Sequence, residues 1–350
     1  MLSSASSDKG KIEFNDTYYY LKHQLLYGLS LGIAGFLTAV LVHYRFWQKI
    51  ALPLLLVCLF LLVLVFTPLG FSHSGASRWL NLGNFSIQPA ELLKFSFIIY
   101  LAAWLNSKKG GNLNRKTSFF KGYLPLLILF GLIAFLIFSQ HSTTTVVIIA
   151  LAALIVYFIS GARLSFVLAT VFLGVLVLIL LVSSSNYRLE RVQTYIKTFF
   201  QPEETLDTQS QGYQLRQSLM SIGSGGIWGV GFGKSTIKFK YLPEPIGDSI
   251  FAVIAEELGF AGVIFLITIF TIFFIRGIMI AKNSKDQFAR LTTIGFISVI
   301  LIQAFINIAA MSGMVPLTGV PLPFVSYGGT SLAVLLTMSG VIVNISKYTS

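Results

Sequence analysis

The sequence predicts an all-α protein that crosses a membrane several times. Of its 350 residues, 55% are hydrophobic and 11% are charged, too few charges to cover a soluble domain of this size. Its apolar runs have the length of a membrane helix, about 20 residues, and lack the alternation of barrel strands. Only helices and closed barrels satisfy the backbone in lipid. We therefore expect residues 1–350 to form a single helical membrane domain.

The charge balance limits the classes of partner. The formal net charge is +12, but no soluble basic domain is present that could bind nucleic acid, and Lys and Arg commonly flank membrane helices. Anionic lipids or phosphates are therefore the favoured partners. The single cysteine, Cys58, lies in an apolar run and can form no intramolecular disulfide, so we expect helix packing to hold the fold together.

Nine apolar segments are long enough to be membrane helices. The connection between 106 and 121 has five Lys or Arg residues and no acidic residue, which predicts a cytoplasmic loop. By alternation, the 43–49 turn, the 161–164 turn, the 276–290 loop and the C-terminus lie on the same side. The nine segments are 23–43, 48–68, 88–106, 121–139, 143–160, 163–185, 248–278, 288–312 and 327–347.

Three segments are predicted on the opposite, extracytoplasmic side: 69–87, 186–247 and 313–326. The second is a large loop of about sixty residues, and long loops in compact domains usually carry function. It contains seven basic residues, which indicate an anionic ligand: Arg188, Arg191, Lys197, Arg216, Lys234, Lys238 and Lys240.

The helix predicted from residue 88 begins with polar side chains. Gln88, Glu91 and Lys94 recur every three residues, so they share one face that points into the helix bundle. In one interpretation, Glu91 and Lys94 form an ion pair that only neutralises itself. In the other, this face binds a substrate, with Arg78 contacting a phosphate and Trp79 stacking on a sugar.

The large loop contains a glycine-rich stretch after the polar run of Gln214, Arg216 and Gln217. Glycines between 223 and 233 would let backbone N–H groups approach an anion closely, although a flexible re-entrant loop would have the same composition. Neither the dinucleotide-binding pattern nor the P-loop pattern is present.

An acidic cluster follows at the next membrane boundary. Asp248 either caps the following helix or carries chemistry, and Glu244 precedes it. Glu256 and Glu257 lie about two turns deeper, where a bare carboxylate is expensive. They are therefore either functional or bridges between helices.

The last outside stretch has three prolines, which hold it extended, and then small residues that permit close packing of the final helix. Ser326 and Tyr327 lie where this stretch meets the helix, and a scaffold role and substrate contact are equally favoured. Asn307 is a mid-helix polar residue that we expect to face another helix. The four histidines are scattered, so no metal or cofactor site is expected.

These four stretches, in this order, resemble the SEDS family of bacterial cell-wall polymerases, which includes FtsW, RodA and SpoVE. The resemblance runs from about residue 4 to 346. It rests on Gly-Ala-Ser-Arg-Trp with Gln-Pro-Ala-Glu-Leu-Leu-Lys, Tyr-Gln-Leu-Arg-Gln-Ser-Leu, Leu-Pro-Glu-Pro-Ile-Gly-Asp-Ser-Ile-Phe-Ala with Glu-Glu-Leu-Gly, and Pro-Leu-Pro-Phe-Val-Ser-Tyr-Gly-Gly-Thr-Ser-Leu.

Family members have ten membrane helices, the first ending in a Ser-Ala-Ser-like sequence that matches residues 3–7 here. The resemblance therefore implies that the first helix is missing. The alternation of the membrane segments points the same way. It places the N-terminus on the outside, although the sequence has no signal sequence to bring it there. The chain also departs from the family at 140–144, which reads Gln-His-Ser-Thr-Thr instead of the usual Gln-Pro-Asp-Leu-Gly-Thr, so any role of that aspartate cannot be transferred.

The resemblance implies a peptidoglycan glycosyltransferase of the bacterial cytoplasmic membrane that polymerises lipid II, an undecaprenyl-pyrophosphate-linked substrate, at the outer face. The family's essential aspartate matches Asp248, which we expect to act as general base. Substrate contacts are expected from Arg78, Trp79, Gln88, Glu91, Lys94, Gln214, Arg216, Gln217, Glu244, Ser326 and Tyr327.

No cofactor is required, although a divalent Mg²⁺ or Mn²⁺ would be compatible with this chemistry. The expected partners are a class B penicillin-binding protein transpeptidase and divisome proteins. The motifs are more FtsW-like, which indicates cell division, and a RodA-like role in elongation is the competing assignment. Two functions of a different class stay open: a lipid II flippase, and a scaffold that only recruits the transpeptidase.

Overall fold

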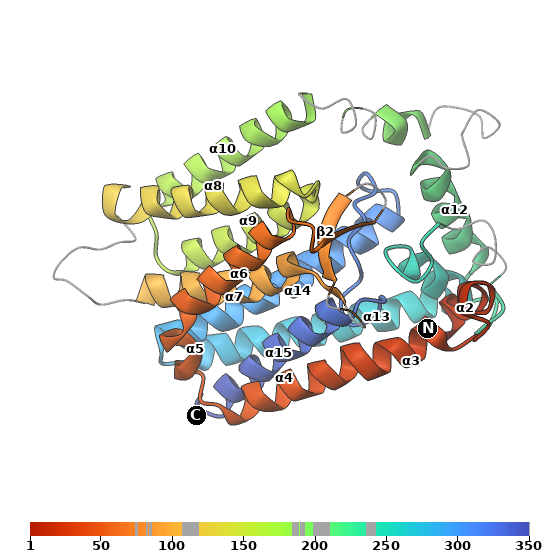
Figure 1. Cartoon of the computed structure of the whole chain (residues 1–350), viewed down its shortest axis with the longest axis horizontal. Helices are drawn as coiled ribbons and strands as arrows, with labels where there is room; N and C mark the ends of the chain where they lie inside the picture. Colours follow the sequence, from red (N-terminus) through yellow and green to blue (C-terminus); the bar gives the residue numbers. More distant parts are fainter. Residues whose placement is uncertain are drawn as a thin grey trace. The chain divides into compact units, whose positions relative to one another are not determined.

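The computed structural model describes residues 1–73, 76–81, 83, 86–106, 119–183, 189, 193–198, 211–235 and 243–349. Each of the nine predicted segments contains a helix within these ranges, which confirms the helical membrane fold (Figure 1). Among the described residues, four helical stretches are long and apolar enough to cross a membrane: Tyr19–Leu41, Ile250–Asn283, Gln287–Met311 and Gly329–Ser346. Shorter apolar helices account for most of the other segments.

The elements follow one another in chain order. They are α1 (Leu2–Ala5), α2 (Ser7–Phe14), α3 (Tyr19–His23), the π-helix η1 (Gln24–Leu29), α4 (Ser30–Leu41), α5 (Arg45–Lys49), α6 (Ala51–Leu64), β1 (Gly70–His73), β2 (Ala76–Asn81), β3 (Ser86–Ile87), α7 (Pro89–Asn106), the π-helix η2 (Phe119–Tyr123), α8 (Leu124–Ser139), α9 (Thr143–Ile159), α10 (Leu164–Ser183), α12 (Gln211–Ser224), α13 (Ile250–Asn283), α14 (Gln287–Met311) and α15 (Gly329–Ser346).

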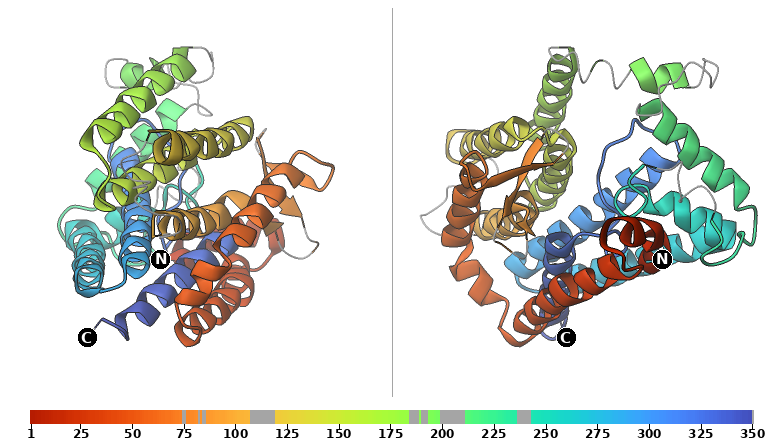
Figure 2. Two further views of the ribbon diagram at one scale, coloured as in Figure 1. Left: turned by 90° about the vertical axis from the view of Figure 1, so that its left-hand side faces the viewer. Right: turned by 45° about the vertical axis from the view of Figure 1, so that its right-hand side comes forward.

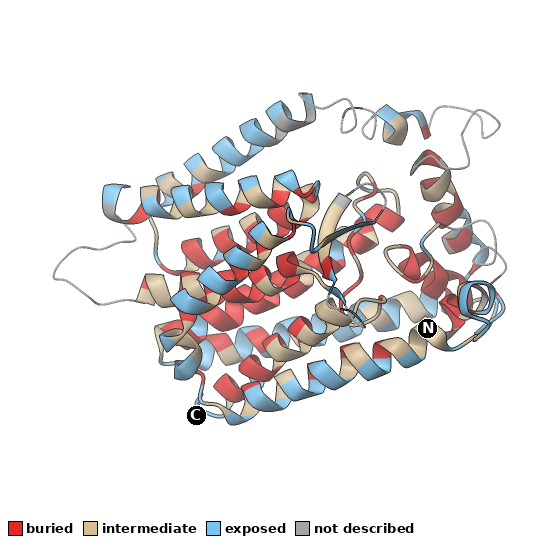
Figure 3. Ribbon diagram, in the orientation of Figure 1, coloured by how far each residue is buried: buried red, intermediate tan, exposed pale blue. Residues whose placement is uncertain are grey.

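The chain divides into two compact units. Unit 1 comprises 1–25, 171–272 and 303–328, and unit 2 comprises 26–170, 273–302 and 329–350. Helix α10 consists largely of exposed residues (Figure 3), and apolar ones such as Leu168, Phe172 and Ile179 are among them. Exposed apolar helices of this kind are stable in contact with lipid.

Helix α7 is the centre of unit 2. It packs against α5, α6, α9 and α15, and its Leu93, Phe97 and Ile99 are completely buried. Phe95 stacks on Phe296 of α14, with ring centroids 5.2 Å apart. Because neighbours surround α7 on most sides, its polar first turn is held inside protein rather than in lipid, where charged groups would be costly.

Helices α4 and α15 lie side by side and run parallel (Figures 1 and 2). Small residues make the contact, because Gly28 approaches Gly329 at its start and Gly340 lies against Phe36 further along. Without a hydrophobic driving force between helices in lipid, such close backbone packing supplies the dispersion contacts that hold them together. The prediction that small residues let the final helix pack closely is therefore confirmed.

A small antiparallel sheet, which no sequence pattern predicted, lies in unit 2 with strand order β1-β2-β3. Phe71 pairs with Trp79 across β1 and β2. The Thr330 hydroxyl accepts from the Gln88 N–H at 3.3 Å and donates to the Ser86 carbonyl at 3.1 Å, so the start of α15 ties β3 to the start of α7.

In unit 1, the glycine-rich stretch after α12 pairs with a break in α13. The break is at Gly259 (φ 66°, ψ −165°), where the helix cannot continue its own hydrogen-bond ladder. Four backbone bonds substitute for the missing ones, as membrane depth requires. They run from Val230 N to Glu256 O, Gly231 N to Glu257 O, Phe260 N to Gly226 O and Ala261 N to Ile227 O, at 2.9 to 3.1 Å.

The pairing decides between the two interpretations of the glycines. Their close approach serves α13, since an added Cβ at Gly225, Gly229 or Gly259 would lie 2.1 to 2.3 Å from a backbone atom. The N–H groups of 229–231 donate to backbone carbonyls, so they do not form an anion site. The stretch is a re-entrant segment packed on a broken helix.

The two deep carboxylates of α13 act as bridges. Glu256 accepts hydrogen bonds from Ser221 and Ser235, each at 2.6 Å, and Glu257 accepts one from Ser4 at 2.5 Å. These bonds join α1, α12 and the end of the glycine-rich stretch to α13, which supports the bridging interpretation over a catalytic one.

Replacing Gly340 with Leu should destabilise the α4–α15 pair, because a Cβ there would lie 2.6 Å from the Phe36 carbonyl oxygen. Overpacking of this kind costs about 1–3 kcal/mol. Thermal unfolding in detergent should show a lower Tm. Gly131→Leu is the matched control, since no atom lies within 4 Å of its added Cβ, and equal Tm losses in the two variants would contradict the proposed contact.

Replacing Gly229 with Ala should destabilise the protein more than replacing Gly233 with Ala. Both glycines have φ of +79°, so both variants carry the same left-handed backbone cost of about 1–2 kcal/mol. Only at Gly229 would the new Cβ also meet a backbone atom, the Glu257 carbonyl oxygen at 2.2 Å. A Tm loss that is no larger for Gly229→Ala would mean that the re-entrant segment is not packed on α13.

Candidate functional site

The candidate site of unit 1 is built around Asp248, in the turn before α13. Its carboxylate is half-buried, and Gln214 of α12 approaches it at 3.5 Å while donating a shorter bond of 3.0 Å to the Ser249 hydroxyl. Ser249 in turn donates to the Pro243 carbonyl at 2.9 Å. Gln214 therefore orients the acidic turn from a separate helix, as a site residue would.

Asn307 of α14 holds the backbone behind this carboxylate. Its Nδ2 donates to the carbonyls of Asp248, at 2.8 Å, and Val320, at 2.7 Å. One turn earlier, Gln303 donates to the Pro321 carbonyl at 3.0 Å. Ala304 and Ile308 on the same helix pack against the start of α13, in agreement with the expectation that Asn307 faces another helix. The Asn307 side chain itself bonds to the irregular backbone just before that helix and at Val320.

The extended proline segment closes the other side of the turn. The Ser326 hydroxyl donates to the Gly247 carbonyl at 2.7 Å, and the Tyr327 N–H donates to the Ile246 carbonyl at 2.9 Å. Gly319 borders the carboxylate, since a Cβ on it would lie 3.8 Å from an Asp248 oxygen. Ser326 thus acts on the backbone of the site, which supports the scaffold role.

Burial and, to a smaller extent, the negative charge of Glu244 together raise the pKa of Asp248 to about 6, against the opposing effect of hydrogen bonds from backbone N–H groups and from Gln214. No ion pair among the described residues involves Asp248. A carboxylate with this pKa is ionised at neutral pH yet basic enough to accept a proton.

Other predicted residues of unit 1 have different surroundings. Arg216 donates through Nε and Nη2 to the Thr198 carbonyl, at 3.3 and 2.9 Å, and Gln217 is buried. Tyr327 bonds through its hydroxyl to His23 at 2.8 Å, so it ties the N-terminal segment to the proline segment. Of the predicted cations in the large loop, Arg188, Arg191, Lys238 and Lys240 lie outside the described residues.

The remaining predicted residues belong to unit 2, which is described by itself. Lys94 and Glu91 form a buried ion pair of 2.8 Å, as the first of the two interpretations required. Arg78 on β2 donates to the carbonyls of Gln140, at 3.2 Å, and His141, at 2.5 Å. Arg78 thereby holds the turn at which this sequence departs from the family pattern.

Ser249, Gln303 and Gly319 also contribute to the site, although no sequence pattern predicted them. A signal existed for Gln303, because it and Asn307 place two amides four residues apart in an otherwise apolar helix. Nothing in the sequence distinguishes Gly319 from other loop glycines. The described residues include no group of three His, Cys, Asp or Glu side chains that could hold a metal.

Comparison with known proteins gives a consistent result. The family model described as "Cell cycle protein" (FTSW_RODA_SPOVE) matches residues 1–350. A probable peptidoglycan glycosyltransferase FtsW from Geobacter sulfurreducens is 37% identical over 99% of this chain and 90% of its own length. Stage V sporulation protein E from Bacillus subtilis is 36% identical over 99% of this chain and 92% of its own.

Solved structures share the fold. A chain from a peptidoglycan synthase complex that coordinates polymerization and crosslinking matches with a TM-score of 0.78, covering 99% of this chain and 95% of that one, at 23% identity. RodA of Thermus thermophilus matches with a TM-score of 0.69, 99% and 93% coverage and 23% identity. With its full-length match to the family model and its relatives above 30% identity, this chain belongs to the FtsW/RodA/SpoVE family of multi-pass membrane proteins.

Proposed function

We propose that this chain is a peptidoglycan glycosyltransferase that polymerises lipid II, with Asp248 as its general base. The enzyme class is the one carried in the names of the FtsW relatives, at 36–38% identity over almost the whole chain. The observation that carries the catalytic assignment is the Asp248 carboxylate, half-buried, oriented by Gln214 and raised in pKa to about 6.

The proposed reaction joins two lipid-linked sugars. The acceptor hydroxyl oxygen attacks the anomeric carbon of the donor, its proton passes to the Asp248 carboxylate, and the bond from that carbon to the pyrophosphate oxygen breaks. The leaving lipid pyrophosphate takes the electron pair. Because the donor carries its own leaving group, the step requires no nucleotide, in line with the absence of a P-loop pattern from the sequence.

Cations would stabilise the negative charge on the departing pyrophosphate. Among the predicted ones, Arg78 and Arg216 are held in position by backbone carbonyls, whereas the charge of Lys94 is balanced by Glu91 at 2.8 Å. We therefore rank the two arginines above Lys94 as phosphate ligands. Trp79, Gln88, Glu244 and Tyr327 remain proposed substrate contacts.

The cellular setting is also a proposal. The positive-inside pattern supports a position of Asp248 on the extracytoplasmic side of the cytoplasmic membrane. A class B penicillin-binding protein transpeptidase is the proposed partner, supported by the fold shared with a chain of a polymerization and crosslinking complex. A role in division with divisome proteins is favoured over elongation, since FtsW is the name of several relatives at 34–38% identity.

Asp248→Asn should abolish polymerisation while leaving substrate binding intact. The amide keeps the shape and the contact with Gln214 but cannot accept the proton, and loss of a general base costs about 10²–10⁴-fold in rate. Purified protein, with the transpeptidase added, would be assayed on fluorescent lipid II by gel separation of glycan chains.

Two further measurements, of Tm and of lipid II binding, distinguish a loss of catalysis in Asp248→Asn from a loss of folding or of substrate binding. Tm should be unchanged or higher in Asp248→Asn, because a half-buried charge is removed, and lipid II binding should persist. A variant that still polymerises at the wild-type rate would exclude Asp248 as the base. If polymerisation is undetectable in the wild type while Asp248→Asn still moves lipid II across vesicles, the flippase function is supported instead.

The pH profile should report the pKa of Asp248. Only the ionised carboxylate accepts a proton, so kcat/KM should rise with pH through about 6 and be lost below it. Glu244→Gln removes a negative charge that raises this pKa, so the acid limb should move to lower pH. Asp16→Asn, a charge loss elsewhere in unit 1 that does not act on Asp248, should leave the limb in place.

A further inference from the structure

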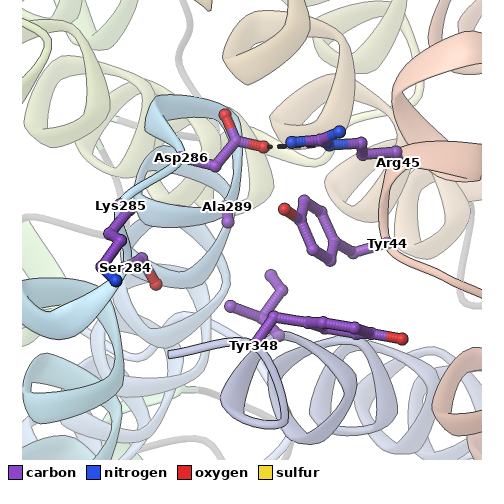
Figure 4. A pocket seen from close by; sticks show the side chains of 8 residues that line it. Tyr44, Arg45, Ser284, Lys285, Asp286, Ala289 and Tyr348 are labelled. Atoms are coloured by element: carbon purple, nitrogen blue, oxygen red, sulfur yellow. Dashed lines mark ion pairs between the residues drawn. The ribbon is translucent and has the colours of Figure 1, made fainter. Parts of the chain in front are cut away.

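A polar cavity lies in unit 2, among helix ends and formed by residues that the proposed reaction does not use. It has a volume of about 390 Å³ and is lined by Tyr44 and Arg45 at the start of α5, Lys285 and Asp286 before α14, and Tyr348 after α15 (Figure 4). All three segments belong to loops that the positive-inside pattern predicts on the cytoplasmic side.

A second cavity, of about 270 Å³, adjoins the first, because Ser284 and Lys285 line both. It extends the space to Arg290 of α14 and to the turn at Ser160 and Gly161 after α9. The two cavities together therefore expose three cationic side chains, Arg45, Lys285 and Arg290, against a single acidic one, Asp286.

The acidic residue is already engaged. The Asp286 Oδ1 accepts the Phe288 N–H at 3.3 Å, which caps the start of α14, and its Oδ2 lies 3.7 Å from Arg45 Nε. A pair at that distance between partly exposed side chains is weak, about 0–1 kcal/mol, so Arg45 can turn to a better acceptor at little cost. The dashed line in Figure 4 marks this pair.

The cationic side chains that line the two cavities come from separate segments of the chain. Arg290 takes part in no ion pair within the described part of the chain, and the N-terminus of α14, which is 25 residues long, adds the positive end of its dipole. The Tyr44 and Tyr348 rings form the apolar wall, and tyrosines are typical of the membrane–water boundary. Basic cavities between helix ends at this boundary suit phosphate headgroups.

We propose that the two cavities form one binding site for a phosphate group, contacted by Arg45, Lys285 and Arg290. The phosphate belongs either to an anionic lipid of the adjoining leaflet or to a soluble phosphate compound. Occupancy would link the 43–49 turn, the 276–290 loop and the C-terminal residues, and it does not depend on the activity proposed for Asp248.

The test uses the full chain in nanodiscs. Native mass spectrometry would count retained phosphatidylglycerol after exchange from mixed nanodiscs that also contain phosphatidylcholine. The wild type should retain the anionic lipid selectively, and Arg45→Gln with Lys285→Gln should weaken that retention about 10-fold or more. Titration with inorganic phosphate identifies the source, because displacement of the lipid at millimolar phosphate indicates that the phosphate group alone is sufficient.

The matched control is Lys49→Gln with Lys282→Gln. It removes two positive charges from the same two loops, but neither residue lines either of the two cavities, so retention should change less than 2-fold. A second cavity variant, Lys285→Gln with Arg290→Gln, keeps the Arg45–Asp286 pair. It should show the same weakened retention, and it replaces the first variant if that one does not fold. Equal retention in the cavity and control variants would overturn the proposal. So would equal retention of the two lipids by the wild type together with no binding of inorganic phosphate at millimolar concentration.

Discussion

The Asn307 amide is the interaction on which the candidate site depends. Both N–H groups of this side chain, inside an apolar helix, donate to carbonyls of irregular backbone, one at Asp248 and one at Val320. A buried carbonyl without a donor costs free energy, so the acidic turn and the proline segment can leave helical geometry here because α14 supplies donors from the buried Asn307. Through these two bonds, a membrane helix fixes the backbone from which the Asp248 carboxylate projects.

The break in α13 follows the same physical rule. Gly259 interrupts the helix, and the re-entrant glycine-rich stretch supplies the donors and acceptors that the helix loses. The helix bearing Asp248 at its start is therefore packed against backbone rather than lipid on one side. Glu256 and Glu257 strengthen this arrangement through hydrogen bonds from serine hydroxyls, which gives these two carboxylates a structural role.

Much of the fold was predictable because lipid restricts the choices. Apolar runs of helix length have one stable form in a bilayer, so the positions of the nine helical segments followed from composition and length. The small sheet of β1, β2 and β3 was missed, since its strands are short and pair with one another across separate segments. The sequence was sufficient to place Asp248 and Gln214 in the candidate site, but not Gly319. Gly319 lies near the Asp248 carboxylate because of the way the proline segment packs on the turn before α13.

By itself, the sequence determined that this chain is a helical membrane protein, that its polar motifs lie between or at the ends of the spans, and that Asp248 is the strongest candidate for catalysis. These conclusions rest on hydrophobicity and motif, which are local properties. Only the tertiary structure decided which polar groups are available for chemistry. From the sequence alone, the glycine N–H groups, the carboxylate of Glu256 and the Lys94–Glu91 pair were all candidates for binding a substrate. The structure shows that each already has a hydrogen-bond or ion-pair partner within the protein.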